Sequence, residues 1–153
     1  MWAVALSVDG EILANSGEDG TVRLWETSTA RLIRTLDGHA GAVWSVALSA
    51  TGELVASGGK DGTARLWDLR TGRPRAISDA HTGAVHGVAL SADGRVLVSG
   101  GFDGLVRVWE AHSGTSLHTL RSDRRYERLD ITGLTGVTTA QRVALHALGA
   151  LER

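Results

Sequence analysis

Short apolar segments separated by turn-forming residues fill most of the chain. After Gly41, four of them follow one another as AVWSVALS, ELVASGG, TARLWDL and RPRAIS. The turns between them read ATG, KDG and RTG, in which Gly supplies the positive φ that hairpin turns need. The pattern predicts four antiparallel strands joined by hairpins.

These segments are apolar on both faces, as VWSVALS illustrates. A strand that faces water on one side alternates apolar and polar residues instead. Two-sided apolarity is typical of a sheet that neighbouring sheets cover on both sides. We therefore expect sheets stacked face to face.

The whole pattern repeats along the chain. DGTVRLWE begins at Asp19, DGTARLWD at Asp61 and DGLVRVWE at Asp103, a spacing of 42 residues both times. Such a period is typical of a propeller array, in which each repeat is one unit that buries its faces against its neighbours. The sequence predicts an all-β fold, a partial β-propeller of three four-stranded antiparallel blades at residues 1–42, 43–84 and 85–121.

The repeats resemble the WD-repeat (WD40) family of β-propellers over about four fifths of the chain. The likeness rests on the Trp-Asp pair at Trp67, its Trp-Glu variants at Trp25 and Trp109, the pairs Gly38-His39 and Ala80-His81, and the SGG-x-DG turns. In that family a His, a Ser or Thr, the turn Asp and the Trp form a hydrogen-bonded stack.

Carried onto this sequence, the resemblance implies two such stacks. They are His39, Ser57, Asp61 and Trp67 in the second repeat, and His81, Ser99, Asp103 and Trp109 in the third. The first repeat departs from the pattern, because Asn15 replaces Ser and no His precedes Asp19 and Trp25.

The stack of the second repeat also has the composition of a hydrolytic triad, with Ser57, His39 and Asp61. A nucleophile needs an exposed oxygen beside oxyanion donors, whereas this Ser lies in the middle of a predicted strand. The same pattern recurs at Ser99, which favours a structural role over a unique active site. We therefore predict that the chain is not an enzyme.

Partner contacts are expected at loop positions that vary between otherwise similar repeats. Two columns vary in this way: Trp2, Trp44 and His86 near the first strand, and Glu18, Lys60 and Phe102 before the turn Asp. In WD-repeat proteins the equivalent positions face the top opening of the ring, where partner peptides dock. These six residues are the candidate partner-binding top face, with Trp44 and Phe102 as anchors. The alternative is that Trp44 packs against its own blade.

The balance of charges argues against nucleic-acid and membrane partners. The 153 residues carry 16 Lys and Arg against 17 Asp and Glu, a net charge of -1. The run RSDRRYER from Arg121 interleaves its Arg residues with Asp123 and Glu127, which is typical of a solvated connector. No stretch reaches the roughly 20 apolar residues that a spanning helix needs. We expect a cytoplasmic protein with no nucleic-acid or membrane partner.

Signals for cofactor and metal sites are weak. The chain has no Cys, and its His, Asp and Glu lack zinc or EF-hand spacing. GGKDGT, from Gly58, lacks the full phosphate-loop pattern and is predicted to join two strands rather than a strand and a helix. We expect no cofactor and no metal.

The last segment, residues 122–153, breaks the period. From Thr138 its apolar residues recur with helical spacing, Thr138 and Gln141 form a capping box, and Gly149 is a candidate C-cap. We predict a short helix over about residues 138–149 that covers the outer face of the third blade. The segment also resembles the tail that follows the final repeat in bacterial WD-repeat proteins.

The resemblance implies a non-catalytic protein-protein interaction scaffold, the C-terminal part of a bacterial WD-repeat sensor or scaffold propeller, with a protein or peptide partner. The alternative is a regulatory sensor segment of a signalling NTPase or protein kinase. Known rings typically have about seven blades, and this chain supplies three. We expect the missing blades to come from an upstream segment or from a homo-oligomer.

Overall fold

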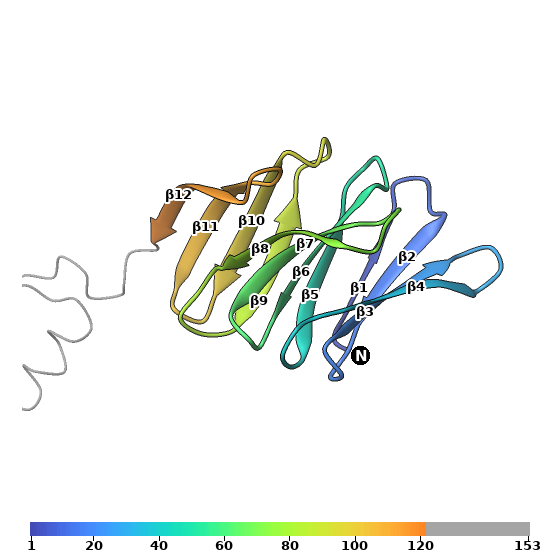
Figure 1. The fold of residues 1–153 in the computed structure, drawn as a ribbon, viewed down its shortest axis with the longest axis horizontal. Coiled ribbons are helices and arrows are strands. Elements are labelled where there is room, and N and C mark those ends of the chain that lie inside the picture. The colour runs from blue at the N-terminus through green and yellow to red at the C-terminus, as the bar shows by residue number, and fades with distance from the viewer. Residues whose placement is uncertain (122–153) are drawn as a thin grey trace, which may run out of the picture. The chain divides into compact units, whose positions relative to one another are not determined.

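The computed structural model describes residues 1–121, apart from the side chains of residues 76–78. Twelve strands form three antiparallel sheets of four strands each, so the prediction of an all-β fold with three four-stranded sheets is confirmed (Figure 1). The predicted helix at 138–149, and the cover it would give to the third sheet, lie outside the described residues.

Each sheet is a meander in chain order. The first contains β1 (Ala3–Leu6), β2 (Ile12–Ser16), β3 (Thr21–Glu26) and β4 (Arg31–Asp37). The second contains β5 (Val43–Leu48), β6 (Leu54–Gly59), β7 (Thr63–Asp68) and β8 (Pro74–Asp79). The third contains β9 (Val85–Leu90), β10 (Val96–Gly101), β11 (Leu105–Glu110) and β12 (Thr115–Arg121).

Glycine makes the hairpin turn between β6 and β7 possible. Gly62 has a φ of +77°, and a Cβ there would lie 2.8 Å from the carbonyl oxygen of His81. A larger residue would therefore meet both backbone strain and a clash with the chain that leads into β9. The turn is thus held against the connection to the next sheet.

The three sheets stack side by side, with β1 next to β5 and β5 next to β9 (Figure 1). Because side chains alternate along a strand, each sheet has two faces. We call one the small-residue face, which in the first sheet carries Ala14, Val22 and Leu24. The other is the tryptophan face, which in the second sheet carries Val46, Val55 and Trp67.

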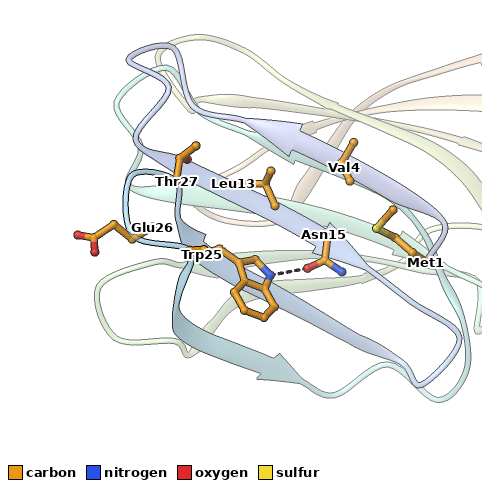
Figure 2. Close-up of a pocket in the computed structure, with 8 residues that line it drawn as sticks. Met1, Val4, Leu13, Asn15, Trp25, Glu26 and Thr27 are labelled. Carbon is orange, nitrogen blue, oxygen red and sulfur yellow. Dashed lines mark hydrogen bonds between the residues drawn. The ribbon is translucent and has the colours of Figure 1, made fainter.

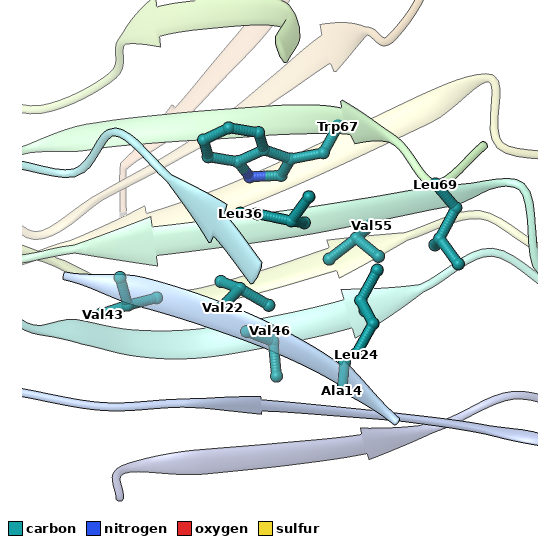
Figure 3. Packing of buried hydrophobic residues seen from close by; sticks show 9 residues of the cluster. All are labelled: Ala14, Val22, Leu24, Leu36, Val43, Val46, Val55, Trp67 and Leu69. Atoms are coloured by element: carbon teal, nitrogen blue, oxygen red, sulfur yellow. The ribbon is translucent and has the colours of Figure 1, made fainter. Parts of the chain in front are cut away.

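Two apolar clusters join the sheets, and each pairs a small-residue face with the tryptophan face of the next sheet. The first cluster packs Ala14, Val22 and Leu24 against Val46, Val55 and Trp67 (Figure 3). The second packs Ala56, Ala64 and Leu66 against Leu97 and Trp109. The core of the described residues therefore lies between sheets rather than within any one of them.

Polar contacts add to the apolar ones at the outer edge of the stack. The guanidinium of Arg34 donates to the carbonyl oxygens of Arg70 and Thr71, both at 3.2 Å, and so joins β4 to the β7–β8 turn. In the described part of the chain no helix is long and apolar enough to cross a membrane.

Leu66→Ala is expected to lower the free energy of unfolding by about 2–5 kcal/mol, because this fully buried side chain fills the space between two sheets. Leu32→Ala removes the same atoms from a side chain that is 45% exposed on β4, and should cost well under half as much. Urea unfolding measures both changes. Equal losses would contradict the placement of the core between the sheets.

Candidate functional site

A chain of hydrogen bonds crosses the second sheet from its interior to its edge. The indole Nε1 of Trp67 donates to Ser57 Oγ at 2.8 Å, and Ser57 Oγ lies 2.8 Å from His39 Nε2. His39 Nδ1 lies 3.0 Å from each carboxylate oxygen of Asp61. The structure thus brings together the four residues that the sequence assigned to this stack.

With His39 neutral and Asp61 ionised, one arrangement of hydrogens satisfies this chain. The carboxylate of Asp61 can only accept, so His39 Nδ1 carries the ring hydrogen and donates to it, which leaves His39 Nε2 as an acceptor. Ser57 Oγ therefore accepts from the indole N–H of Trp67 and donates its own hydrogen to His39 Nε2. All the bonds therefore run in one direction, from Trp67 to Asp61.

The electrostatics favour a neutral His39 beside an ionised Asp61. Burial lowers the pKa of His39, and this effect outweighs the opposing attraction of Asp61. Burial also raises the pKa of Asp61, but the hydrogen bonds from His39, Ala40 N and Thr63 together lower it to about 2. The carboxylate is therefore charged at neutral pH and satisfied by several donors.

Asp61 joins two segments that are distant in the sequence. Its Oδ2 accepts from the backbone N–H of Ala40 at 3.0 Å, in the connection between β4 and β5. Its Oδ1 accepts from the hydroxyl of Thr63 at 2.8 Å, in its own turn. Sequence reasoning did not include Thr63 in the stack, although its hydroxyl also lies 3.2 Å from His39 Nδ1. The Thr of the DGT motif is the sequence signal that could have indicated it.

The third sheet repeats the stack with its own residues. Trp109 Nε1 donates to Ser99 Oγ at 3.0 Å, and Ser99 Oγ lies 2.9 Å from His81 Nε2. His81 Nδ1 lies 2.8 Å from Asp103 Oδ1. Burial raises the pKa of Asp103, but its hydrogen bonds, with that from His81 the largest, leave the pKa below its usual value.

The Trp and the turn Asp of the first sheet have other hydrogen-bond partners. Trp25 Nε1 donates to Asn15 Oδ1 at 2.6 Å, so the amide oxygen takes the place of the serine hydroxyl. Asp19 instead pairs with Arg23 and accepts from Thr21, and these bonds, that of Arg23 first, lower its pKa to about 2. Among the described residues, the side-chain bonds of Asp19 therefore stay within its own turn and the start of β3.

Ser57, His39 and Asp61 are hydrogen-bonded in the same succession as a hydrolytic triad, but a substrate cannot reach the serine. Ser57 has no exposed surface, and its oxygen already accepts from Trp67. A substrate carbonyl would need the position that the indole occupies. Ser99 is equally buried and bonded in the third sheet. The arrangement supports a structural role for both serines.

An aromatic row links the second and third sheets at the end where β5 and β9 begin. The ring of His86 lies 4.9 Å from that of Trp44 and 5.8 Å from that of Phe102, measured between centroids. Phe102 is 78% exposed and His86 is exposed, while Trp44 is partly buried. We call these three residues the aromatic edge.

The other three predicted top-face residues lie in equivalent places but outside this row. Trp2 Nε1 donates to Glu18 Oε2 at 2.9 Å, so these two residues of the first sheet bond to each other. Lys60 is exposed on the β6–β7 turn. The structure therefore joins Trp44, His86 and Phe102, and separately Trp2 and Glu18.

The structure has a hollow on the first sheet that the sequence analysis did not assign. The hollow has a volume of about 500 Å³ on the tryptophan face of that sheet (Figure 2). Its lining includes Met1, Val4, Leu13, Asn15 and Trp25. The 42-residue spacing is the signal for it, because the same positions in the later sheets are covered by a neighbour.

Residues 1–121 contain neither a metal-binding group nor a phosphate loop. That part of the chain holds no group of three His, Cys, Asp or Glu residues placed to bind a metal ion. The GGKDGT segment forms the turn between two strands, β6 and β7, and not the strand-to-helix turn of a phosphate loop.

Ser57→Ala is expected to lower the free energy of unfolding by about 2–3 kcal/mol, because it leaves the Trp67 N–H and His39 Nε2 buried without partners. Ser28→Ala, on an exposed turn, is the matched control and should change it by less than about 0.5 kcal/mol. Chemical unfolding followed by tryptophan fluorescence compares the two. Similar values would show that the stack adds nothing to stability.

Stability is expected to fall on acidification in two stages. The pKa of His39 is lower in the folded state than its ordinary 6.5, so unfolded chains bind the proton first and stability drops below about pH 6.5. The pKa of Asp61 falls from 3.8 to about 2, so a second loss follows between about pH 4 and pH 2.

Unfolding curves of wild type and His39→Gln at several pH values test the first stage. The advantage of the wild type should be larger at pH 7 than at pH 5, because only the wild type loses the His39 contribution. A constant difference across this range would contradict the assignment.

The comparison with protein families agrees with the repeats. The family model described as "WD domain, G-beta repeat" matches three times, at residues 1–26, 30–68 and 72–110. No curated protein matches the chain. Because three successive matches of the family model cover most of the sequence, the chain belongs to the WD40 repeat family.

Proposed function

We propose that this chain is a non-catalytic protein-interaction module whose aromatic edge binds a peptide or protein partner. WD40 repeats generally mediate protein-protein interaction, and the family is typically non-enzymatic. The single observation that carries the proposal is the row of Trp44, His86 and Phe102, which lies open at the end of two adjacent sheets.

Aromatic residues at a surface are the side chains that contribute most to binding energy at interfaces. Phe102 keeps 78% of its surface exposed, although burying a side chain of this size is favourable. The contiguous rings of His86 and Trp44 extend this apolar surface. The matching partner is a segment that presents an apolar or aromatic side chain.

The buried stack of the third sheet holds this surface in place. Asp103 follows Phe102 directly in the turn and is bonded to His81 at 2.8 Å. The backbone N–H of Phe102 donates to the carbonyl of Ala84 at 2.9 Å. A surface that is fixed before binding loses little conformational entropy when the partner arrives. The stacks therefore support binding indirectly, by positioning.

The absence of catalysis is part of the proposal. Its support is the burial of Ser57 and Ser99, whose hydroxyls are both engaged in hydrogen bonds within their sheets. Labelling with a serine-reactive probe would contradict it.

We place the module, as a finer proposal, in the C-terminal part of a bacterial sensor or scaffold, because of the likeness of its tail to the tails of such proteins. The alternative role, regulating a signalling NTPase or kinase, requires such a domain in the same polypeptide. A scaffold needs only the binding surface, and that surface lies within the described residues.

Peptides selected from a random displayed library against the full chain are the probe for this proposal. We expect Phe102→Ala and Trp44→Ala each to weaken binding of a selected peptide about tenfold or more, measured by fluorescence anisotropy. Val8→Ala, exposed on the β1–β2 turn at the other end of the sheet, should leave binding unchanged. Equal binding by all variants, or no selected peptide, would overturn the proposal.

A further inference from the structure

Two faces of the stack of sheets have no neighbour among residues 1–121. One is the tryptophan face of the first sheet, where Val4 is 58% exposed, although the equivalent Val46 of the second sheet is only 8% exposed. The other is the small-residue face of the third sheet, where Val106 is exposed although the equivalent Ala64 is buried.

These two faces are the halves of an interface that the chain already makes twice. The first and second sheets meet through small-residue and tryptophan faces, and so do the second and third. At a spacing of 42 residues, Val98, Val106 and Val108 correspond to Ala56, Ala64 and Leu66. In the same way Val4, Leu13 and Trp25 correspond to Val46, Val55 and Trp67.

A pair of glycines shows the match at the level of single atoms. A Cβ on Gly58 would lie 2.5 Å from Val85 Cγ1 and 2.9 Å from Val88 Cγ1, so the third sheet fits against bare backbone here. Gly100 holds the same place on the third sheet, and no atom of the described residues lies within 4 Å of its Cβ position. That space corresponds to the side chains of Met1 and Val4, which are the equivalents of Val85 and Val88.

The opposite half offers a matching apolar hollow. Its volume of about 500 Å³ is lined by Met1, Val4, Leu13 and Trp25 (Figure 2). Over the equivalent residues of the second sheet, this space is filled by Ala14, Val22 and Leu24 of the preceding sheet. The third sheet presents valines in those places, which are of suitable size and polarity to fill the hollow.

We propose that a second copy of this chain docks head to tail, with the small-residue face of its third sheet on the tryptophan face of the first sheet. Two copies bring six sheets together, which lies within the roughly four to eight blades of closed propellers. The contact is heterologous, because the two surfaces differ, so a pair is complete only when the ring closes.

Absolute mass in solution, from light scattering during size-exclusion chromatography of the full chain, tests the proposal. The wild type should have the mass of two chains. Val4→Asp, which blocks one face, and Val106→Asp, which blocks the other, should each have the mass of one chain, because a buried unpaired charge is costly. Val8→Asp adds the same charge on the exposed β1–β2 turn and should leave the pair intact.

Mixing Val4→Asp with Val106→Asp distinguishes a head-to-tail contact from a symmetric one. The mixture retains one intact pair of faces and should regain a two-chain species that neither variant forms alone. Gly100→Val is a second, uncharged variant, which should fold because its site is open in a single chain, yet should weaken association at least tenfold. Circular dichroism checks that each variant folds.

A single-chain mass for the wild type would overturn the proposal and would indicate that another segment covers these faces. Association that survives both Asp variants, or a mixture that stays as separate chains, would also overturn it. A mass that rises without limit would replace the closed pair with an open chain of copies and contradict closure.

Discussion

A four-stranded sheet that is apolar on both faces cannot be stable alone in water, and the described part of this protein is arranged around that constraint. The small-residue faces of the first and second sheets are each covered by the tryptophan face of the next sheet. The resulting core lies between sheets, so stability depends on neighbours rather than on any single repeat. Three sheets have only two interfaces between them, so two faces have no neighbour among residues 1–121.

The buried stacks address a different requirement, which is to fix the loops at the end of the sheets. A carboxylate with several donors, a neutral His and a buried Ser join the β6–β7 turn to the segment that precedes β5. Such a fully bonded network is costly to disturb, because any missing partner leaves a buried polar group unsatisfied. The same residue types could perform hydrolysis elsewhere; here burial of Ser57 favours support over chemistry.

The turn that carries Phe102 and Asp103 contains both a residue of the buried stack and a residue of the proposed binding surface. The side chain of Asp103 points to His81 and stabilises the turn, while that of Phe102 is exposed and contacts His86. Adjacent residues therefore serve the interior and the surface. This division explains how a repeat can keep its turn Asp constant and still vary the residue before it, as Glu18, Lys60 and Phe102 do.

The sequence by itself determined the strands and their grouping into three sheets, and the resemblance to WD repeats implied four members of the stack in the second and third sheets. The strands of the second sheet lie within one residue of their predicted ends, because turn glycines and apolar runs act locally. The helix at 138–149 stays a prediction. Only the tertiary structure decided which face meets which neighbour and that Thr63 joins the stack. It also decided that Arg34 donates hydrogen bonds to the next sheet and that His86 lies between Trp44 and Phe102. Alternation along a strand assigns each residue to a face. What covers that face is determined by side chains of the neighbouring sheet, which lie about one repeat away in the sequence.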